Sequence, residues 1–492
     1  MLSHNTFPSN KRKRNTVFKK KKSDSRRAKP HPNNVKPPGN YYLDSFEDSF
    51  VDTRVTGMGR MLSLLDDQSI SNIIECLPGR DLSTLSCVSK AFYIYCQEED
   101  HWKRLCIKEF VGSFQFVKNW QRTYKTMKRP NLTFKTDHIE IRADFFYSEI
   151  MYHSWRCLSA NLTQWCKKDN VDRREALSVQ DFVKEYDMGN KPVVITDVVT
   201  QWPAFKDKLW TREQLVKDHG DTKFYINAGM HMKLKDFFTY SSQVNEENPA
   251  YLFDPKFGEE CPKLLQDYQV PKYFEEDFFS CLEAERPNYR WFLAGPAKSG
   301  ATFHKDPNHT SAWNACVTGH KKWVMYPPHI TPPGVYPSAD GLEVTAPISI
   351  VEWFQNFYED DRGDDDDEDG ANQDGQNKDA PIEFIQRPGD LVYVPTGWWH
   401  IVLNLEECIA VTHNFCNTHN IHNVSRFIRT KNSEKLIDKF SAAMNRHYPD
   451  VWKDVSDKEE KRQSENKSAR VVFWEKLEQT HEDKPFVFDF GE

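Results

Sequence analysis

Short apolar runs separated by turn residues dominate the middle of the chain, from about residue 171 to 417. Each run is rich in β-branched or aromatic residues and is bounded by Gly, Pro or Asn, a pattern typical of short β-strands. The clearest runs cover 192–196, 311–317, 322–326, 390–394 and 409–412. Many short strands of this kind predict a β-sandwich or jelly roll.

Helical periodicity flanks the β-rich region on both sides. Between residues 64 and 110, apolar positions fall near helical spacing on either side of a break at Pro78-Gly79. These segments predict short helices that are stable only when packed. Residues 424–448 again alternate apolar and charged positions at helical spacing, and the segment after them predicts one further charged helix.

With 492 residues, the chain is too long for one ordinary domain. Its hydrophobic fraction of 38% is low, so we expect much of it to be solvated loop or tail. The pattern predicts an α+β protein with five parts. They are a disordered basic tail (1–60), a helical module (61–110), a helical linker (111–170), the β-rich domain (171–420) and C-terminal helices (421–492).

The formal net charge of −7 conceals two opposite blocks. Lys and Arg cluster at 11–14, 19–22 and 26–27, in a stretch too polar to form a core. This tail predicts nuclear import or an arm that contacts RNA, although few aromatic residues support RNA binding, and a solubilising tail is the alternative. An acidic block at 359–380 predicts a mobile surface insertion.

Other classes of protein are disfavoured by what the sequence lacks. No secretory signal opens it, and no apolar run approaches the roughly 20 residues that a membrane span needs. We therefore expect a soluble intracellular protein without a membrane partner. The 11 cysteines include no CxxC pair, which argues against zinc fingers and disulfide frameworks.

Three residues form a candidate metal site. His304 and Asp306 stand at positions i and i+2, which share one face of an extended strand. His400 ends a turn, strand and bend that begin at Pro388, and a jelly roll places such distant strands side by side. Two histidines and a carboxylate form the facial triad of non-haem Fe(II) oxygenases, although a His-x-Asp pair alone is weak evidence.

Longer strings surround these ligands at 299–307, 310–315, 319–323, 395–400 and 412–415, with Asn404 between the last two. Together they resemble the phosphatidylserine-receptor-like branch of the JmjC family, over roughly 172–451. The resemblance implies a cupin-like double-stranded β-helix, with Fe(II) held by His304, Asp306 and His400. It also implies 2-oxoglutarate as the co-substrate.

The same resemblance implies roles for three further residues. Lys321 matches the lysine that holds the distal carboxylate of 2-oxoglutarate, and a buried dianion needs such a cation. Asn314 and Thr412 match polar co-substrate contacts, with ordinary strand residues as the alternative reading. Ala301 stands where the family often has a threonine, and Thr302 would face the other way.

The strings 77–82, 88–92 and 102–106 resemble an F-box. An F-box implies three helices that dock onto the Skp-type adaptor of cullin-based ubiquitin ligases. The alternative is a plain helical hairpin packed against the catalytic domain.

The JmjC resemblance implies that decarboxylation of 2-oxoglutarate to succinate drives hydroxylation of lysyl side chains or demethylation of methyl-arginine. Basic disordered tails of nuclear proteins, such as histones or splicing factors, are the expected substrates, and the acidic block could attract them. The competing hypothesis is an F-box substrate receptor that uses a non-catalytic JmjC domain as a binding platform. The intact set of His304, Asp306, His400 and Lys321 favours the enzyme.

Overall fold

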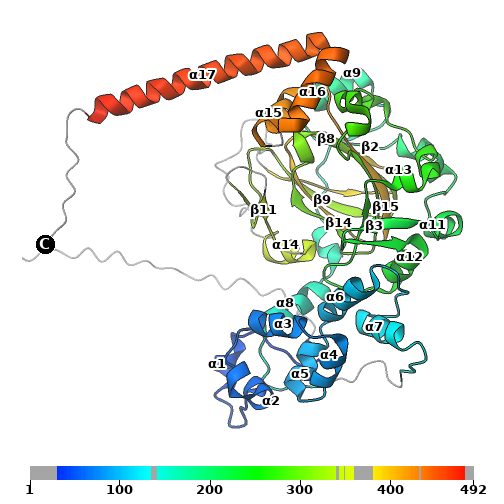
Figure 1. Ribbon diagram of the computed structural model, residues 1–492, viewed down its shortest axis with the longest axis vertical. Helices are drawn as coiled ribbons and strands as arrows, with labels where there is room; N and C mark the ends of the chain where they lie inside the picture. The colour runs from blue at the N-terminus through cyan, green and yellow to red at the C-terminus, as the bar shows by residue number, and fades with distance from the viewer. Residues whose placement is uncertain are drawn as a thin grey trace, which may run out of the picture.

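The structure is a computed structural model that describes residues 30–134, 141–338, 343–347, 349–358, 380–431 and 434–481. The basic clusters, and the acidic block up to residue 379, lie outside the described residues. Figure 1 shows a helical module formed by the N-terminal part, a β-sheet domain next to it, and helices of the C-terminal part beyond the sheets.

Two sheets form the β-rich domain. The larger has nine strands in the order β1-β2-β13-β8-β15-β6-β5-β3-β4, and the smaller has four in the order β12-β9-β14-β7. The larger sheet comprises β1 Arg173–Arg174, β2 Val193–Ile195, β3 Lys223–Ile226, β4 Met230–Lys233, β5 Leu252–Asp254, β6 Arg290–Gly295, β8 Ser311–Thr318, β13 Leu391–Val394 and β15 Cys408–Phe415. The smaller comprises β7 Gly300–His304, β9 Lys321–Tyr326, β12 Ile382–Gln386 and β14 Trp399–Asn404.

This arrangement confirms the predicted jelly roll. The five clearest apolar runs of the sequence form β2, β8, β9, β13 and β15. Short helices, together with a small pair of strands, cover and connect the sheets: α9 Val179–Phe182, α10 Pro203–Lys206, α11 Arg212–His219, α12 Leu234–Gln243, α13 Phe257–Glu260, α14 Ile350–Asn356, β10 Tyr336–Pro337 and β11 Val344–Thr345.

Successive residues of each strand face opposite sides of a sheet, and this alternation decides what lies between the sheets. On β8, Trp313 and Ala315 pack outward into the large core beneath the helices, whereas Ala312 packs inward. The inner core also takes Trp323 from β9 and Val392 from β13. Polar residues at inward positions therefore face a largely apolar interior.

Adjacent lysines on β9 illustrate the alternation. Lys321 shares its face with the inward Trp323, whereas Lys322 shares its face with Val324 in the core beneath α14. Lys322 Nζ lies 2.8 Å from Glu383 Oε2, and both side chains are fully buried. Lys322 is thus one half of a buried ion pair on the outer side of the smaller sheet.

The N-terminal module consists of α1 Asn40–Asp44, α2 Thr53–Leu62, α3 Asp67–Glu75, α4 Gly79–Leu85, α5 Lys90–Cys96 and α6 Glu99–Phe110. Apolar residues at the predicted helical spacing form its core, among them Ile70, Leu82 and Trp102. Trp102 Nε1 donates a hydrogen bond to the Cys96 carbonyl at 2.8 Å.

The segment predicted as a disordered tail, residues 1–60, contains α1 and most of α2. Lys36 pairs with Asp44 at 2.7 Å, and Tyr147 also donates to Asp44 at 2.7 Å. Backbone hydrogen bonds join Lys36 to Phe146 and Ser148. Partners more than a hundred residues away thus order this segment, and local composition does not reveal them.

The linker contains α7 Trp120–Lys128 and α8 Glu149–Leu158, and it fastens the helical module to the jelly roll. Buried Trp120 packs on Tyr240 of α12, with 5.4 Å between ring centroids. Its Nε1 donates to Glu246, which also pairs with Lys103 of α6 at 2.6 Å. Both parts therefore share one continuous core.

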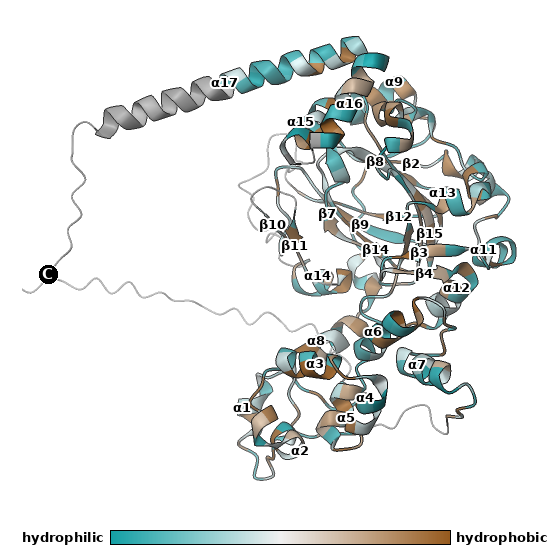
Figure 2. Cartoon of the chain, in the orientation of Figure 1, coloured by the Kyte–Doolittle hydropathy of each residue, from teal (hydrophilic) through white to brown (hydrophobic). Residues whose placement is uncertain are grey.

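Three helices follow the last strand: α15 Ile421–Lys431, α16 Glu434–His447 and α17 Pro449–His481. Figure 2 shows mainly hydrophilic residues along the part of α17 that it colours. Buried Ile428, Phe440 and Trp452 join the three helices to each other, and Phe279 of the domain packs on Phe440. Among the described residues, no helix is both long and apolar enough to cross a membrane.

Candidate metal and co-substrate site

The three predicted metal ligands meet at one end of the smaller sheet. His304 is the last residue of β7, Asp306 follows two residues later, and His400 lies on β14 directly opposite His304. One ligand atom from each residue lies within 4.8 Å of the others. The two imidazole ring centroids are 4.1 Å apart. This arrangement can hold a single ion.

An irregularity in β7 aims these side chains. His304 pairs with His400 and Ala301 pairs with Val402, so the register shifts by one residue between the two pairs. Bulges of this kind re-aim side chains and are common beside active sites. Ala301 consequently packs inward with His304, and Thr302 is exposed, as the sequence predicts.

Backbone carbonyls orient both imidazoles. His304 Nδ1 lies 2.7 Å from the Thr302 carbonyl, and His400 Nδ1 lies 3.1 Å from the Trp398 carbonyl. A neutral histidine that donates from Nδ1 keeps the Nε2 lone pair for a metal. Burial is the main reason why the pKa of His400 lies well below its usual value, and the neighbouring His304 lowers it further. The low pKa favours the neutral form.

The Asp306 carboxylate fits a metal for a different reason. Its Oδ1 accepts a hydrogen bond from Asn414 Nδ2 at 3.0 Å, but its buried Oδ2 has no hydrogen-bond partner within the described chain. Burial raises the pKa of Asp306, although His304 and Asn414 oppose that rise. A buried unpaired carboxylate oxygen is costly, and a metal ion between Asp306 and the imidazoles would remove that cost.

The support from Asn414 was not predicted. This residue occupies an inward position of β15, two residues beyond Thr412, and it also donates to Thr310 Oγ1 at 2.9 Å. The only signal in the sequence was its place within the string 412–415.

Lys321 lies inside the barrel with 1% of its surface exposed. Its Nζ donates to Asn404 Oδ1 at 2.9 Å and, among the described residues, has no carboxylate within ion-pair distance. Burial lowers the pKa of Lys321, but Tyr251 and two neighbouring thiols raise it above its ordinary value. The interior therefore contains a cation that can pair with an anionic ligand.

Asn314 and Thr412 stand opposite each other on β8 and β15. Asn314 Oδ1 is buried and accepts no hydrogen bond within the described chain, and its amide can turn to present either its oxygen or its NH₂ group. Thr412 Oγ1 instead donates to the Trp313 carbonyl at 2.8 Å. Of these two residues, Asn314 is the one with a buried polar atom that has no hydrogen-bond partner among the described residues. The co-substrate roles of both residues stay predictions.

A cavity of about 710 Å³ opens over the candidate ligands. Its floor includes His304 and Asp306, and its walls include Arg426 and Phe427 of α15. Lys305 Nζ lies 4.7 Å from the Trp399 ring centroid at the same cavity. Helix α15 thus forms part of the wall of the site, which its sequence did not indicate.

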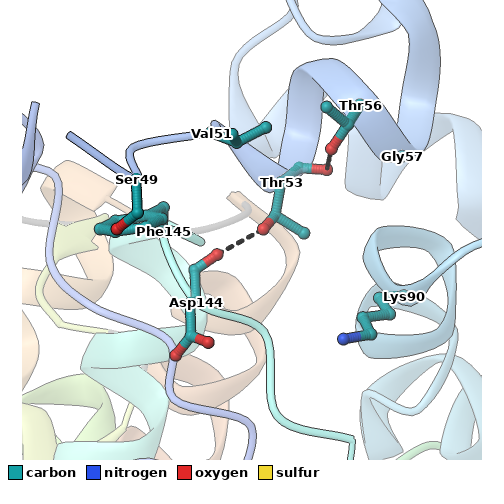
Figure 3. Close-up of a pocket in the computed structure, with 8 residues that line it drawn as sticks. All are labelled: Ser49, Val51, Thr53, Thr56, Gly57, Lys90, Asp144 and Phe145. Carbon is teal, nitrogen blue, oxygen red and sulfur yellow. Dashed lines mark hydrogen bonds between the residues drawn. The ribbon is translucent and has the colours of Figure 1, made fainter. Parts of the chain in front are cut away.

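A second cavity, of about 460 Å³, lies in the helical module and is shown in Figure 3. The Thr53 hydroxyl donates to the Asp144 carbonyl across it, and Lys90 lies on another side. No histidine or cysteine lines it. This cavity has one carboxylate, that of Asp144, but no imidazole, so it lacks the set of ligands gathered at the end of the smaller sheet.

Comparison with known proteins agrees with the geometry. Residues 179–421 match the model of the cupin-like domain family, and residues 62–104 match that of the F-box domain. Arginine-specific demethylase JMJ22 of Arabidopsis thaliana is 40% identical over 454 residues, which cover 90% of this chain and 86% of that protein.

Two further relatives match about half of the chain. The bifunctional arginine demethylase and lysyl-hydroxylase psr-1 of Caenorhabditis elegans is 38% identical over 52% of this chain and 63% of its own length. The 2-oxoglutarate and iron-dependent oxygenase JMJD4 of Homo sapiens is 28% identical over 53% of this chain and 64% of its own length.

A double-stranded β-helix with two histidines and a carboxylate at one end defines the class of non-haem iron oxygenases. The chain belongs to the JmjC family of iron- and 2-oxoglutarate-dependent oxygenases, and an F-box domain precedes its catalytic domain. The expected fold, enzyme class and cofactors are confirmed. The non-catalytic platform is not favoured.

The geometry predicts that Asp306→Ala abolishes binding of Mn²⁺, a hard ion that can replace iron, because two imidazoles alone anchor it poorly. Asn414→Ala, which releases the Asp306 carboxylate and Thr310 but removes no ligand, should weaken binding about 10–100-fold. Calorimetric titration measures both affinities. His309→Ala, which changes a histidine of the same cavity outside the cluster, is the matched control. Full Mn²⁺ affinity in folded Asp306→Ala would exclude this site.

Proposed function

We propose that the enzyme oxidises methyl-arginine or lysyl side chains of protein substrates, with iron bound by His304, Asp306 and His400. The observation that carries the iron assignment is the buried Asp306 Oδ2, which has no hydrogen-bond partner among the described residues and lies beside two imidazoles whose Nδ1 atoms are already bonded. Bound iron and 2-oxoglutarate supply the chemistry, in which co-substrate decarboxylation is coupled to oxidation of a substrate C–H bond.

In this proposal the chain's own residues bind the co-substrate and hold it in position. Lys321 neutralises the distal carboxylate of 2-oxoglutarate, and Asn404 holds the lysine, since its Oδ1 accepts from Nζ at 2.9 Å. Asn404 is itself fixed by donating to Ser299 Oγ at 2.9 Å. Asn314 offers a further polar contact from β8. The inner apolar core around Trp323 limits access of water to this end of the barrel.

Methyl-arginine is the substrate side chain that we favour. The relative that matches along 90% of this chain is named as an arginine-specific demethylase, and psr-1 is named for both activities. Aromatic rings of Trp399 and Phe427 line the cavity above the metal cluster, and such rings can bind a delocalised guanidinium. Hydroxylation of a methyl carbon on nitrogen releases formaldehyde, whereas hydroxylation of a lysyl carbon leaves a stable alcohol.

Nuclear proteins with basic flexible segments remain the proposed substrates. The basic clusters between residues 11 and 27 support nuclear import and an RNA contact by their composition alone. The acidic block could attract basic segments through its charge.

We further propose that the F-box domain docks onto a Skp-type adaptor. Buried Leu82 and Trp102 hold its helices together, whereas Leu64 and Val88 are 79% and 64% exposed. Ile73 is 49% exposed on α3. A contiguous exposed apolar patch marks a protein-binding face, and we propose that Leu64, Ile73 and Val88 belong to one.

Lys321→Met should weaken 2-oxoglutarate binding by more than tenfold. Truncating one member of a buried charge pair costs roughly 2–5 kcal/mol, and about 1.4 kcal/mol corresponds to a factor of ten. Calorimetric titration with 2-oxoglutarate in the presence of Mn²⁺ measures the change, and Mn²⁺ affinity should stay the same. Lys305→Met removes a cation from the outer cavity and serves as control. Unchanged co-substrate affinity in Lys321→Met would contradict this role.

Matched basic peptides separate the two reactions. We expect a peptide with methyl-arginine to yield one formaldehyde for each succinate, and the unmethylated peptide to yield none. Mass spectrometry of a lysine-containing version detects any added oxygen, and folded Asp306→Ala is the blank. Added oxygen on lysine without formaldehyde would replace demethylation by hydroxylation, and succinate that no peptide stimulates would contradict both.

Leu64→Glu and Val88→Glu should each weaken adaptor binding by more than tenfold, because a charge at an apolar contact costs about 2 kcal/mol or more. Pull-down with purified adaptor measures this loss. Met188→Glu, at a 65% exposed position of the catalytic domain, is the control. These point changes are preferable to a truncation because the module shares its core with the jelly roll. Binding that survives both changes would remove this face as the docking site.

A further inference from the structure

A second group of potential metal ligands lies where α8 meets the jelly roll. His153, Cys157 and Glu247 each place a ligand atom within 4.8 Å of the others. His153 and Cys157 are four residues apart on α8 and therefore share one face of the helix. Glu247 comes from the segment after α12. Figure 1 shows α8 at the junction of the helical module and the sheets.

A fourth donor comes from α14. Glu352 Oε1 lies 3.5 Å from His153 Nε2, and Cys157 Sγ lies 3.7 Å from the same nitrogen. Zinc bonds of about 2.0–2.3 Å in a tetrahedral site separate neighbouring donor atoms by about 3.4–3.6 Å. The observed separations are close to those values, so an ion would require only small side-chain shifts.

The surroundings position these donors and balance their charge. Ser349 Oγ donates to Glu247 Oε1 at 2.7 Å, which fixes the carboxylate. Lys298 Nζ is held nearby by the Leu158 carbonyl at 2.5 Å, and its charge interacts with Cys157 and Glu247. A dication with one thiolate and two carboxylates leaves one excess negative charge, which Lys298 offsets.

An ion can reach this group from solvent. His153, Glu247 and Glu352 line a cavity of about 790 Å³ that also contains Asp100 and Glu149. Its lining lysine, Lys103, is paired with Glu246, so the remaining carboxylates of the wall attract cations. Burial is the main cause that raises the pKa of the Cys157 thiol, and the negative charge of Glu247 raises it further. A thiol that binds a dication gives up its proton to solvent.

We propose that four side chains bind a structural zinc ion at this junction: His153, Cys157, Glu247 and Glu352. Zinc suits the set because imidazole, thiolate and carboxylate are its usual ligands, whereas the catalytic cluster contains no sulfur. Such an ion would join the linker helix α8 to α14 and to the segment after α12. It would thereby fix the helical module relative to the catalytic domain.

Cobalt substitution tests the proposal without any assay of turnover. The full chain with Asp306→Ala, which lacks one catalytic ligand, is stripped of metal and titrated with Co²⁺. We expect one Co²⁺ per chain to produce a thiolate-to-cobalt charge-transfer band in the near ultraviolet. Zn²⁺ should abolish the band by displacement and should raise the melting temperature.

Variants assign the ligands. Cys157→Ser should remove the band, and Cys166→Ser, which changes the half-buried cysteine beyond α8, should retain it. His153→Ala and Glu247→Gln should each weaken Co²⁺ binding by at least tenfold. A folded Asp306→Ala chain without the band would overturn the proposal, as would a band that survives Cys157→Ser. The Co²⁺ titration of the Asp306→Ala chain retains Cys157. It therefore tests the proposal even if Cys157→Ser does not fold.

Discussion

The antiparallel pairing of β14 with β7 is the contact on which the site depends. It places His400 opposite His304, although these residues lie on separate strands far apart in the sequence. On its other edge β14 pairs with β9 along six residue pairs, so its register is fixed from both sides. A slip of one residue would turn every side chain of β14 to the opposite face and remove His400 from the cluster.

The same alternation gives two adjacent lysines opposite surroundings. Lys322 faces the outer core and is neutralised by Glu383, whereas Lys321 faces the barrel interior, where no carboxylate of the described residues lies within ion-pair distance. Leaving a buried charge unpaired is far more costly than burying a pair. The interior charge is therefore expensive in the free enzyme, and binding of a dianionic co-substrate relieves that cost. The alternation of side chains along β9 thus gives Lys322 a structural role and leaves Lys321 available to a ligand.

The sequence predicted the features that have a local signal. Strands such as 322–326 are recognisable from their β-branched and aromatic residues and from the turn residues that bound them. His304 and Asp306 are recognisable from their spacing, which suits two ligands of one metal ion. Contacts between distant segments escaped prediction. The order of α1 depends on Tyr147, Asn414 reaches Asp306 across the sheets, and α15 reaches the cavity only through the packing of the C-terminal helices. No local pattern in these segments encodes such partners.

Buried contacts at the junction also limit how the two modules can work together. Glu246 accepts from Trp120, pairs with Lys103 at 2.6 Å and accepts from Tyr240 at 3.3 Å, so one carboxylate joins α6, α7 and α12. Burial raises the pKa of Glu246, and Lys103 with Trp120 opposes that rise. Removing any partner would leave polar groups unpaired in the core. A protein docked on the F-box helices would therefore be held in a fixed orientation to the candidate metal cavity.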